Sequence, residues 1–521
     1  TADVKSGTIE IGGGWPKIHD ISGRFGYLDH RVFFSPSEAK IFGVDVSDSE
    51  LKIEKTGTPE ATLVLNGMAT ATVSDLVRYV VESPLNKVTK GTLSNMVGNG
   101  YGELELSLEI PLLNRKNTLV DGVISLIGSR LRINDKAPEL EDFEALVEFN
   151  KSAVTIRNGQ ARIFDGQATF ASKNVDRGLG RIEFTADTSS KAFMDYLNIP
   201  IDLSGQIGSS GVLEFKSSEL QIDLNVELKR LISELPSPLD RLGGKKQLLK
   251  VIYVSKKSGF REVTFFDGNR KVGNLVFFNR NLVKGSINSA DLVEDNVLFI
   301  GGNISGVDID GWRHFFDKRK KEGLTDAFPL TVLVDTQIDR VDVYGNAYES
   351  VKIQGQFLRN DGLFSVDSEK VSGKIAFSGY GGDDAKLSVH LTRLAMRRSA
   401  YKPQSKTQKT EVHQPLIAID AVIDKFELDD VERGAVTFRA TPNNGRWDIG
   451  ELSTITEMGT LTMRGQWQPG IQPKVEYEVE FNVEDVGQYL FSLEGSEYMD
   501  GGAGRLSGSV SWQGSPFALD L

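Results

Sequence analysis

Apolar and polar residues alternate through much of this chain, most clearly over residues 102–112. One side of an extended segment there carries four apolar residues, Leu104, Leu106, Leu108 and Ile110. The other side carries Glu103, Glu105, Ser107 and Glu109. Successive side chains of a β-strand point to opposite faces, so the pattern predicts a strand with one apolar and one polar face.

The same alternation returns in the last fifth of the chain. Three further apolar rows have this spacing: Ile417, Ile419 and Ile423; Leu461, Met463 and Trp467; and Val475, Tyr477, Val479 and Phe481. A protein built from one-sided strands has a long apolar face to hide from water. What covers that face is therefore the functional question.

Glycine-rich turns join these strands. The 521 residues include 53 glycines and only 16 prolines, and the length exceeds what one compact core usually serves. Pairs that favour hairpin turns recur at Asn158-Gly159, Asp165-Gly166, Asp267-Gly268, Asp361-Gly362 and Asn444-Gly445. We expect a mainly β protein, an elongated, twisted antiparallel sheet that curls into a continuous hydrophobic groove.

Short amphipathic helices are expected between groups of strands. Apolar residues at helical spacing predict them at 73–83, 190–198, 228–235, 311–321 and 483–493. The prolines of Pro236-Ser237-Pro238 mark a boundary. We therefore divide the chain into groove repeats at 1–235 and 236–396, a flexible polar loop at 397–414, and a last groove segment at 415–521.

Charge and cysteine content exclude several functions. The net charge is −12, with acids and bases interspersed, which argues against nucleic acid as the partner. The absence of cysteine excludes disulfides and thiolate metal sites and suits an oxidising compartment such as the periplasm. No apolar run is long enough to span a membrane. We expect a segment of a longer protein, with any anchor or export signal outside it.

Catalytic motifs are missing from the sequence. The five histidines do not share metal-ligand spacing: His19, His30, His314, His390 and His413. Neither HExxH nor GxSxG occurs. Residues 308–311 (Asp-Ile-Asp-Gly) faintly resemble a calcium loop, but the expected glutamate is absent. We expect no enzyme activity, no metal and no cofactor.

Several local motifs, taken in order, resemble a known family. They are WPKIHDISGRF at 15–25, ESPL at 82–85, LEIPL at 108–112, DIDGW at 308–312, DVG at 485–487 and GRLSGSVSWQGSP at 504–516. Together they resemble the YhdP branch of the AsmA-like proteins of Gram-negative bacteria. The likeness covers essentially the whole chain and corresponds to the middle and later part of such a protein, without the membrane helix.

The resemblance implies a fold and a role. AsmA-like proteins are similar to bridge-like lipid transfer proteins built of repeating β-grooves, anchored in the inner membrane with a periplasmic body. The YhdP branch is associated with moving phospholipid toward the outer membrane and maintaining its permeability barrier. The expected partners are phospholipid acyl chains, the two membranes and other envelope proteins. The motifs carry turn and strand residues, so no catalytic residue is implied.

The apolar rows are the candidate lining of the groove. With roughly thirty strands about 4.8 Å apart, such a groove would run on the order of 140 Å. The alternative is that the rows pack as ordinary core. Basic residues of the fourth expected helix are candidates for contact with lipid headgroups, with a solvated helix face as the alternative: Arg313, Lys318, Arg319, Lys320 and Lys321.

Two non-enzymatic alternatives remain open from the sequence. One is a structural β-solenoid with a sealed core, which would show short-period ladders. The other is an envelope scaffold that binds proteins along exposed strand edges.

Overall fold

A computed structural model describes most of the chain. The described residues are 1–10, 14–89, 91, 93–114, 117–133, 138–172, 181–197, 203–215, 219–228, 230–240, 248–256, 258–279, 281–291, 293–321, 330–379, 382, 384–397, 416–470, 473–494 and 500–514. The predicted polar loop at 397–414 lies outside them except for Arg397.

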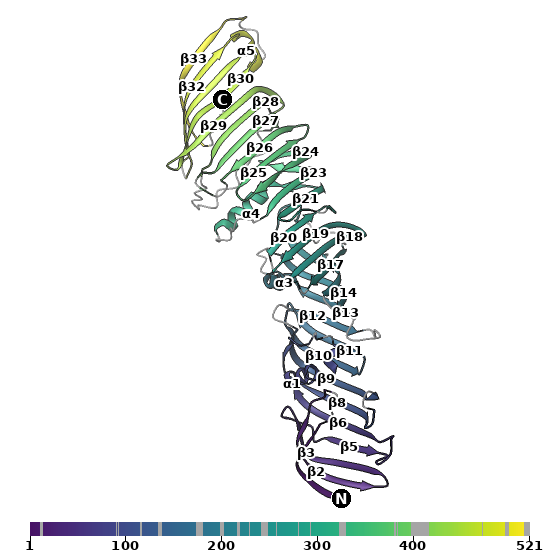
Figure 1. Ribbon diagram of the computed structural model, residues 1–521. Helices are drawn as coiled ribbons and strands as arrows, with labels where there is room; N and C mark the ends of the chain where they lie inside the picture. Colours follow the sequence, from purple (N-terminus) through teal and green to yellow (C-terminus); the bar gives the residue numbers. More distant parts are fainter. Residues whose placement is uncertain are drawn as a thin grey trace. The chain divides into compact units, whose positions relative to one another are not determined.

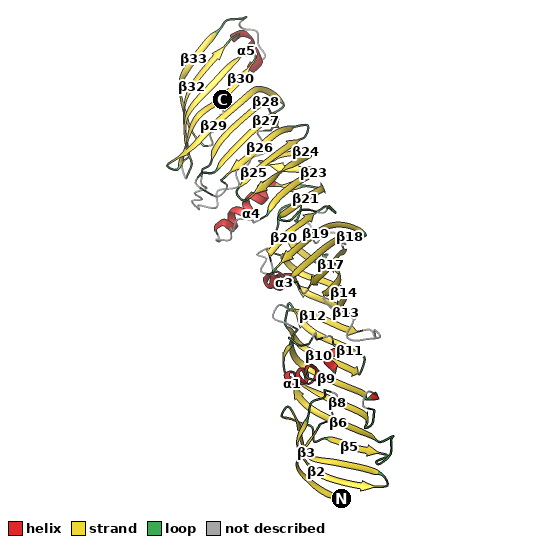
Figure 2. Cartoon of the chain, viewed as in Figure 1, coloured by secondary structure: helices red, strands yellow, loops and turns green. Residues whose placement is uncertain are grey.

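The described residues form 33 strands and five helices, so the mainly β prediction is confirmed (Figures 1 and 2). The first strands are β1 (Ala2–Ile9), β2 (Ile18–Leu28), β3 (Arg31–Ile41), β4 (Val44–Asp45), β5 (Ser49–Glu54), β6 (Thr62–Thr72), β7 (Val97–Asn99), β8 (Tyr101–Pro111) and β9 (Leu119–Arg132). They are followed by β10 (Leu140–Asn150), β11 (Val154–Ile163), β12 (Gly166–Ser172), β13 (Arg181–Ser189), β14 (Leu203–Phe215), β15 (Glu219–Glu227), β16 (Leu231–Ser233), β17 (Leu248–Lys256) and β18 (Phe260–Asp267).

The second half of the chain continues in the same manner. Its strands are β19 (Arg270–Phe278), β20 (Asn281–Ile287), β21 (Val297–Ile304), β22 (Val307–Asp308), β23 (Thr331–Val343), β24 (Asn346–Leu358), β25 (Asp361–Asp367), β26 (Val371–Ser378) and β27 (Lys386–Met396). The last are β28 (Ala418–Leu428), β29 (Val431–Asn443), β30 (Arg446–Thr456), β31 (Gly459–Gln468), β32 (Lys474–Val483) and β33 (Gly504–Gln513). The helices are α1 (Val73–Val81), α2 (Leu85–Val88), α3 (Ser190–Leu197), α4 (Ile309–Lys321) and α5 (Val486–Glu494).

The chain forms two compact units. Unit 1 comprises residues 1–234 and 241–271, and unit 2 comprises 235–240 and 272–521. Within each unit the long strands pair largely with their neighbours in the sequence. Four short strands each pair with one long strand: β4 with β3, β7 with β9, β16 with β14, and β22 with β23.

The sheet is mixed rather than purely antiparallel, which corrects the prediction. Parallel pairings join β20 to β21, β21 and β22 to β23, and β27 to β28. Parallel neighbours need a connection that crosses from one end of the strands to the other. Helix α4 lies in the sequence between β22 and β23, and residues 397–417 lie between β27 and β28.

Four of the five predicted helices are present, as α1, α3, α4 and α5. The predicted helix at 228–235 is wrong, because residues 231–233 form β16 and pair with β14. Leu231 and Leu235 are buried there while Ile232 is exposed. A short apolar run fits the periodicity of a helix or of a strand, and here pairing with Leu203–Gly205 makes it a strand.

The predicted turns are only partly correct. Asn444-Gly445 joins β29 to β30 with φ of +48° and +78°, the geometry of a two-residue hairpin. By contrast, Asn158-Gly159 lies inside β11, where the register against β10 shifts, so this pair makes a bulge.

Helix α1 shows how the sequence places a helix on the sheet. The Thr72 hydroxyl accepts from the Asp75 backbone N–H (3.2 Å) and donates to the Asp75 carboxylate (2.6 Å), which caps the helix. A Cβ added at Gly98 would lie 2.4 Å from Val73 Cγ1, and one at Gly102 2.8 Å from Leu76 Cδ1. These glycines therefore let α1 approach the sheet closely.

Removing the cap should loosen α1 locally. Thr72→Ala should lower the opening free energy of the α1 amides by about 1 kcal/mol, because one N-terminal N–H loses its acceptor. Hydrogen–deuterium exchange measures this, with Thr70→Ala on the exposed side of β6 as the control. Equal protection of α1 in both variants would contradict the role of the cap.

Candidate functional site: the apolar face of the sheet

The strand register gathers apolar side chains on one face of the sheet in each unit, which we call the apolar face. In unit 1 one row pairs Leu65 of β6 with Leu108 of β8, and Leu108 with Val120 of β9. Further along, another row crosses six strands through Phe170, Phe184, Gly211, Leu224, Val251 and Phe265. All six of these residues are half-buried.

Unit 2 has the same organisation over more strands. A single row passes through Phe364, Ile375, Val389, Ala421, Phe438, Leu452, Met463 and Val479. Six of the eight are half-buried, and Phe438 and Met463 are buried. The row spans β25 to β32 without a polar side chain.

The opposite face is polar. In unit 2 it carries a ladder of ion pairs, Lys386–Asp420 (3.6 Å), Arg439–Asp420 (3.3 Å) and Arg439–Glu451 (2.6 Å). In unit 1 the hydroxyls of Thr169 and Thr185 lie 2.7 Å apart on that face. Each exposed ion pair of this kind contributes little to stability, but its charged groups keep this face hydrated.

The predicted lining residues of unit 1 differ in their accessibility. Leu104 and Leu106 are half-buried, whereas Leu108 and Ile110 are 1% and 3% exposed. All four contribute to one apolar cluster together with α1.

The predicted lining residues of unit 2 lie together on the apolar face. Leu461 pairs with Phe481, Met463 with Val479 and Trp467 with Val475. Ile419, Ile423, Leu461, Trp467, Val479 and Phe481 are half-buried. Val475 and Tyr477 are 0% and 2% exposed. Ile417, also half-buried, precedes β28, and its carbonyl accepts from Trp447 Nε1 (2.8 Å).

Sequence reasoning missed the aromatic rows of the middle strands because glycines interrupt their alternation. Phe357 pairs with Gly362, Gly355 with Phe364, and Gly362 with Phe377. A Cβ at Gly362 would lie 2.4 Å from Phe377 Cζ, and one at Gly122 2.2 Å from Phe149 Cζ. The rings therefore lie over glycines of neighbouring strands. A glycine in one strand and a phenylalanine at the paired position of the next strand form the sequence pattern that could have predicted these rows.

Helix α1 closes part of the apolar face in unit 1. Leu76 and Tyr79 of α1, Trp15, and the segment 41–46 pack over β6 and β8. The space left between them is about 60 Å³ and is bounded by Leu104 and Leu106. This is room for about two water molecules and not for an acyl tail.

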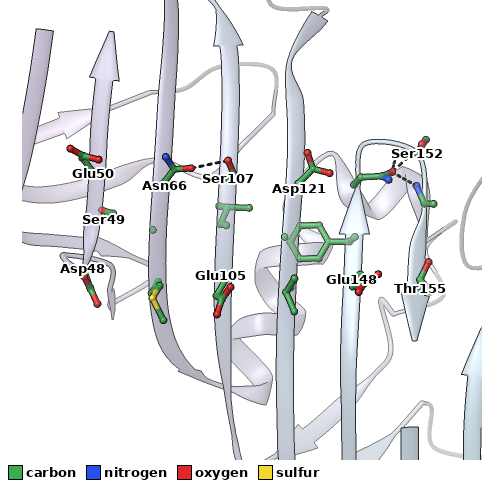
Figure 3. Close-up of a pocket in the computed structure, with 18 residues that line it drawn as sticks. Asp48, Ser49, Glu50, Asn66, Glu105, Ser107, Asp121, Glu148, Ser152 and Thr155 are labelled. Carbon is green, nitrogen blue, oxygen red and sulfur yellow. Dashed lines mark hydrogen bonds between the residues drawn. The ribbon is translucent and has the colours of Figure 1, made fainter. Parts of the chain in front are cut away.

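A second hollow of unit 1 lies on the polar face (Figure 3). It measures about 1010 Å³ and crosses β5 to β11. Five carboxylates line it: Asp48, Glu50, Glu105, Asp121 and Glu148. Carboxylates that would lose water beneath a tail do not suit hydrocarbon, so the size of this hollow does not make it the candidate site.

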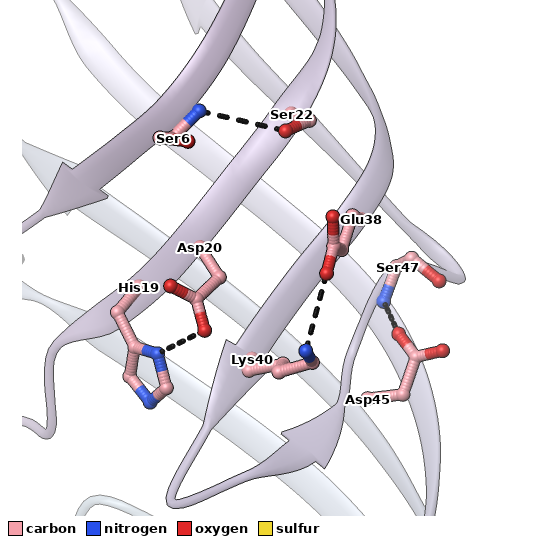
Figure 4. A network of polar contacts seen from close by, with 8 residues as sticks. All are labelled: Ser6, His19, Asp20, Ser22, Glu38, Lys40, Asp45 and Ser47. Atoms are coloured by element: carbon pink, nitrogen blue, oxygen red, sulfur yellow. Dashed lines mark hydrogen bonds and ion pairs between the residues drawn. The ribbon is translucent and has the colours of Figure 1, made fainter.

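Polar contacts of the first strands are ordinary surface pairs (Figure 4). His19 Nδ1 lies 3.1 Å from Asp20, and Lys40 donates to Glu38 (3.1 Å), a hydrogen bond that raises the pKa of Lys40. Hydrogen bonds from Ser47 lower the pKa of Asp45. Among the described residues, no group of three or more histidine or carboxylate side chains could hold a metal ion.

The calcium-loop alternative at 308–311 is explained by helix capping. Asp308 Oδ1 accepts from the Gly311 backbone N–H (2.9 Å) at the start of α4, and Asp310 Oδ2 accepts from the Gly345 N–H (3.3 Å). Both carboxylates are thus used by backbone donors.

Of the predicted headgroup contacts, only Arg313 has a described side chain. It lies 3.5 Å from Asp310 and over the Tyr344 ring, 5.0 Å from its centroid. The side chains of Lys318, Arg319, Lys320 and Lys321 lie outside the described part of the structure.

This architecture defines a class of protein: in each unit a β-sheet with one face apolar and the other charged, and short helices at its strand ends. The chain belongs to the YhdP protein family, whose model matches residues 1–521. This is the AsmA-like branch expected from the ordered motifs. No curated protein and no solved structure matches the chain. None of the described helices has the length and apolarity needed to span a membrane.

One polar atom lies buried within the apolar face of unit 2. The Tyr477 hydroxyl has no hydrogen-bond partner among the described residues, and its ring packs against Trp512 (5.5 Å between centroids). Desolvation by the surrounding apolar side chains raises the pKa of Tyr477 above its usual value.

This buried hydroxyl should make unit 2 sensitive to alkali. An unfolded tyrosine ionises near pH 10, while folded Tyr477 stays protonated, so stability is present below pH 10 and falls as the pH rises above it. At pH 11 the loss is about 1.4 kcal/mol, which Tyr477→Phe should abolish.

Urea unfolding at pH 8 and pH 11, followed by tryptophan fluorescence, measures the difference. Tyr27→Phe, which removes a hydroxyl already exposed to water, is the control. If Tyr477→Phe and Tyr27→Phe lose equal stability between the two pH values, the Tyr477 hydroxyl is not held in an apolar environment.

Proposed function

We propose that this chain binds the acyl tails of phospholipids on the apolar face of its sheet and lets them move along it. The proposed setting is the periplasm of a Gram-negative bacterium, with the full-length protein anchored in the inner membrane by a segment outside this chain. The proposed result is phospholipid delivery to the outer membrane and support of its permeability barrier.

The observation that carries the proposal is the half-buried row from Phe170 to Phe265. It crosses β12 to β18, six strands spaced about 4.8 Å apart, which gives roughly 24 Å of apolar surface. One leaflet of a bilayer has hydrocarbon about 15 Å deep. The row thus offers a continuous apolar path along which tails can pass from strand to strand, and its side chains retain contact with solvent.

The energetics support a carrier of this kind. Moving acyl chains into water costs about 0.8 kcal/mol for each methylene, so two chains with about thirty methylenes cost on the order of 20 kcal/mol. An apolar surface that receives the tails removes most of that cost. The polar headgroup can stay in water at the margin of the sheet.

A second candidate function follows from the buried rows. Leu108, Ile110, Val475 and Tyr477 are almost fully enclosed. Enclosure of this kind throughout would favour a structural or protein-binding envelope scaffold with a sealed core. The half-buried rows of both units are the reason to prefer lipid transport.

A charge on the apolar face should block lipid passage. Leu224→Lys and Val479→Lys place an ammonium group among hydrocarbon, at a cost of about 2.5–3.5 kcal/mol, so local tail occupancy should fall roughly 100-fold. Crosslinking of a phospholipid with a photoreactive tail measures occupancy and transfer.

The matched controls place the same charge on the polar face. Asn225→Lys follows Leu224 on β15 and points the other way. Ser507→Lys lies beside Glu480, which follows Val479 and points to the polar face. All four variants should keep their β circular dichroism. If crosslinking is unchanged in the apolar-face variants, these rows are core and the sealed-core function is correct.

A further inference from the structure

The helices of each unit lie at one end of the strands. In unit 1, α1 follows the end of β6 and α3 follows the end of β13, and the antiparallel register places these two ends on the same margin of the sheet. Phe164 at that margin contacts Phe193 and Tyr196 of α3, with ring centroids 5.3 Å and 5.1 Å apart.

Unit 2 repeats the arrangement with α4 and α5. Helix α4 contacts the turn after β23 through Asp310 and Arg313, and α5 follows the end of β32. Tyr489 of α5 packs on Phe481 of the apolar face, with ring centroids 4.8 Å apart. The pairings from β23 to β32 place both contacts on the same side, which we call the helix margin of unit 2.

The opposite margin of unit 2 carries tryptophan. Trp447 of β30 pairs with Trp467 of β31, Trp467 with Val475 of β32, and Val475 with Trp512 of β33. We call this side the tryptophan margin. Three of the five tryptophans of the chain thus share one row of the apolar face, at the strand ends.

The orientation of two indoles is fixed by hydrogen bonds. Trp447 Nε1 donates to the Ile417 carbonyl (2.8 Å), and Trp467 Nε1 donates to the Gly514 carbonyl (2.9 Å). The rings of Trp447 and Trp467 lie 5.0 Å apart, and all three indoles are half-buried. Tryptophan favours such a border because one part of it is apolar and its N–H is polar.

The residues next to Trp447 and Val475 along the strands are charged, and by alternation their side chains point to the polar face. Arg446 pairs with Asp448 (3.1 Å), and Lys474 pairs with Glu476. The apolar face itself continues inward from the indoles through the row of Phe438, Leu452 and Val479. Toward the tryptophan margin this face therefore passes from hydrocarbon to indole, the same order as a bilayer from its core to its interface.

We propose that the tryptophan margin of unit 2 is the headgroup side of the lipid-binding face, with the glycerol region at the level of the indoles and the tails directed toward α5. This proposal rests on the proposed lipid-binding function. It assigns the ligand as a glycerophospholipid held in one orientation.

Distances from a headgroup spin label test the orientation. The natural chain has no cysteine, so one can be introduced at Gln468 on the tryptophan margin or at Leu506 on the helix margin, both exposed. Each variant carries a nitroxide and is loaded with phosphatidylcholine bearing a nitroxide on its headgroup. The expected result is a shorter interspin distance for Gln468→Cys than for Leu506→Cys.

Tail-labelled phosphatidylcholine supplies the matched control. A nitroxide near the methyl end of the tail should give the reverse order of distances. Equal distances, or a headgroup closer to Leu506→Cys, would overturn the orientation while lipid binding stands. A dipolar signal at neither site with either lipid would show that no lipid is bound, and would overturn the proposed function as well.

A second measurement avoids labels on the protein. In Trp15→Phe/Trp312→Phe protein only the three margin tryptophans fluoresce. A nitroxide at a shallow tail position should quench this fluorescence at least twofold more than one near the methyl end. Stronger quenching by the deep label would overturn the proposal.

Discussion

The structure depends on the register of the backbone hydrogen bonds between neighbouring strands. Because side chains alternate along a strand, a slip of one residue would exchange the apolar and polar faces of that strand. In unit 2 the rows through Val479 and Phe481 stay on one face across successive pairings. The ion-pair ladder around Arg439 stays on the other. A continuous apolar face therefore exists only where this alternation is kept from strand to strand.

Glycines on neighbouring strands let phenylalanine rings lie flat against the apolar face. If the paired residue on the next strand had a side chain, the phenylalanine ring would have to project away from the sheet. Beside Gly122 or Gly362 the ring lies down instead, at a distance that a single added Cβ would forbid. The face thus gains apolar surface without filling the space above it. Helices α1 and α5 have the opposite effect, since Leu76 and Tyr489 cover the face where they pack.

Much of the fold could be predicted from the sequence because it depends on local periodicity. The strand around Leu106 and the helix after Thr72 are set by short-range spacing and capping, and both are present. The errors arise where the outcome depends on a partner strand. Residues 231–233 have helical spacing but pair with β14, and Asn158 has a turn sequence but lies opposite β10.

The candidate site could be predicted only in part for the same reason. Alternation places Leu104 and Leu108 on one face, but it cannot tell that Leu108 is enclosed while Leu104 keeps contact with solvent. That difference depends on which segments fold over each row. The rows containing Phe364 and Phe377 were missed because glycines on the same face hide the alternation. The tryptophan row becomes visible only when β30, β31 and β33 are aligned.

The central claim is that the apolar face is open to hydrocarbon rather than filled by the protein's own side chains. Mass spectrometry of organic extracts from the purified, folded chain tests it most directly. The account predicts phospholipid in at least equimolar amount, retained through purification and exchanged when the protein is incubated with vesicles of a different lipid. A folded chain that carries no lipid and takes up none from vesicles would contradict the account.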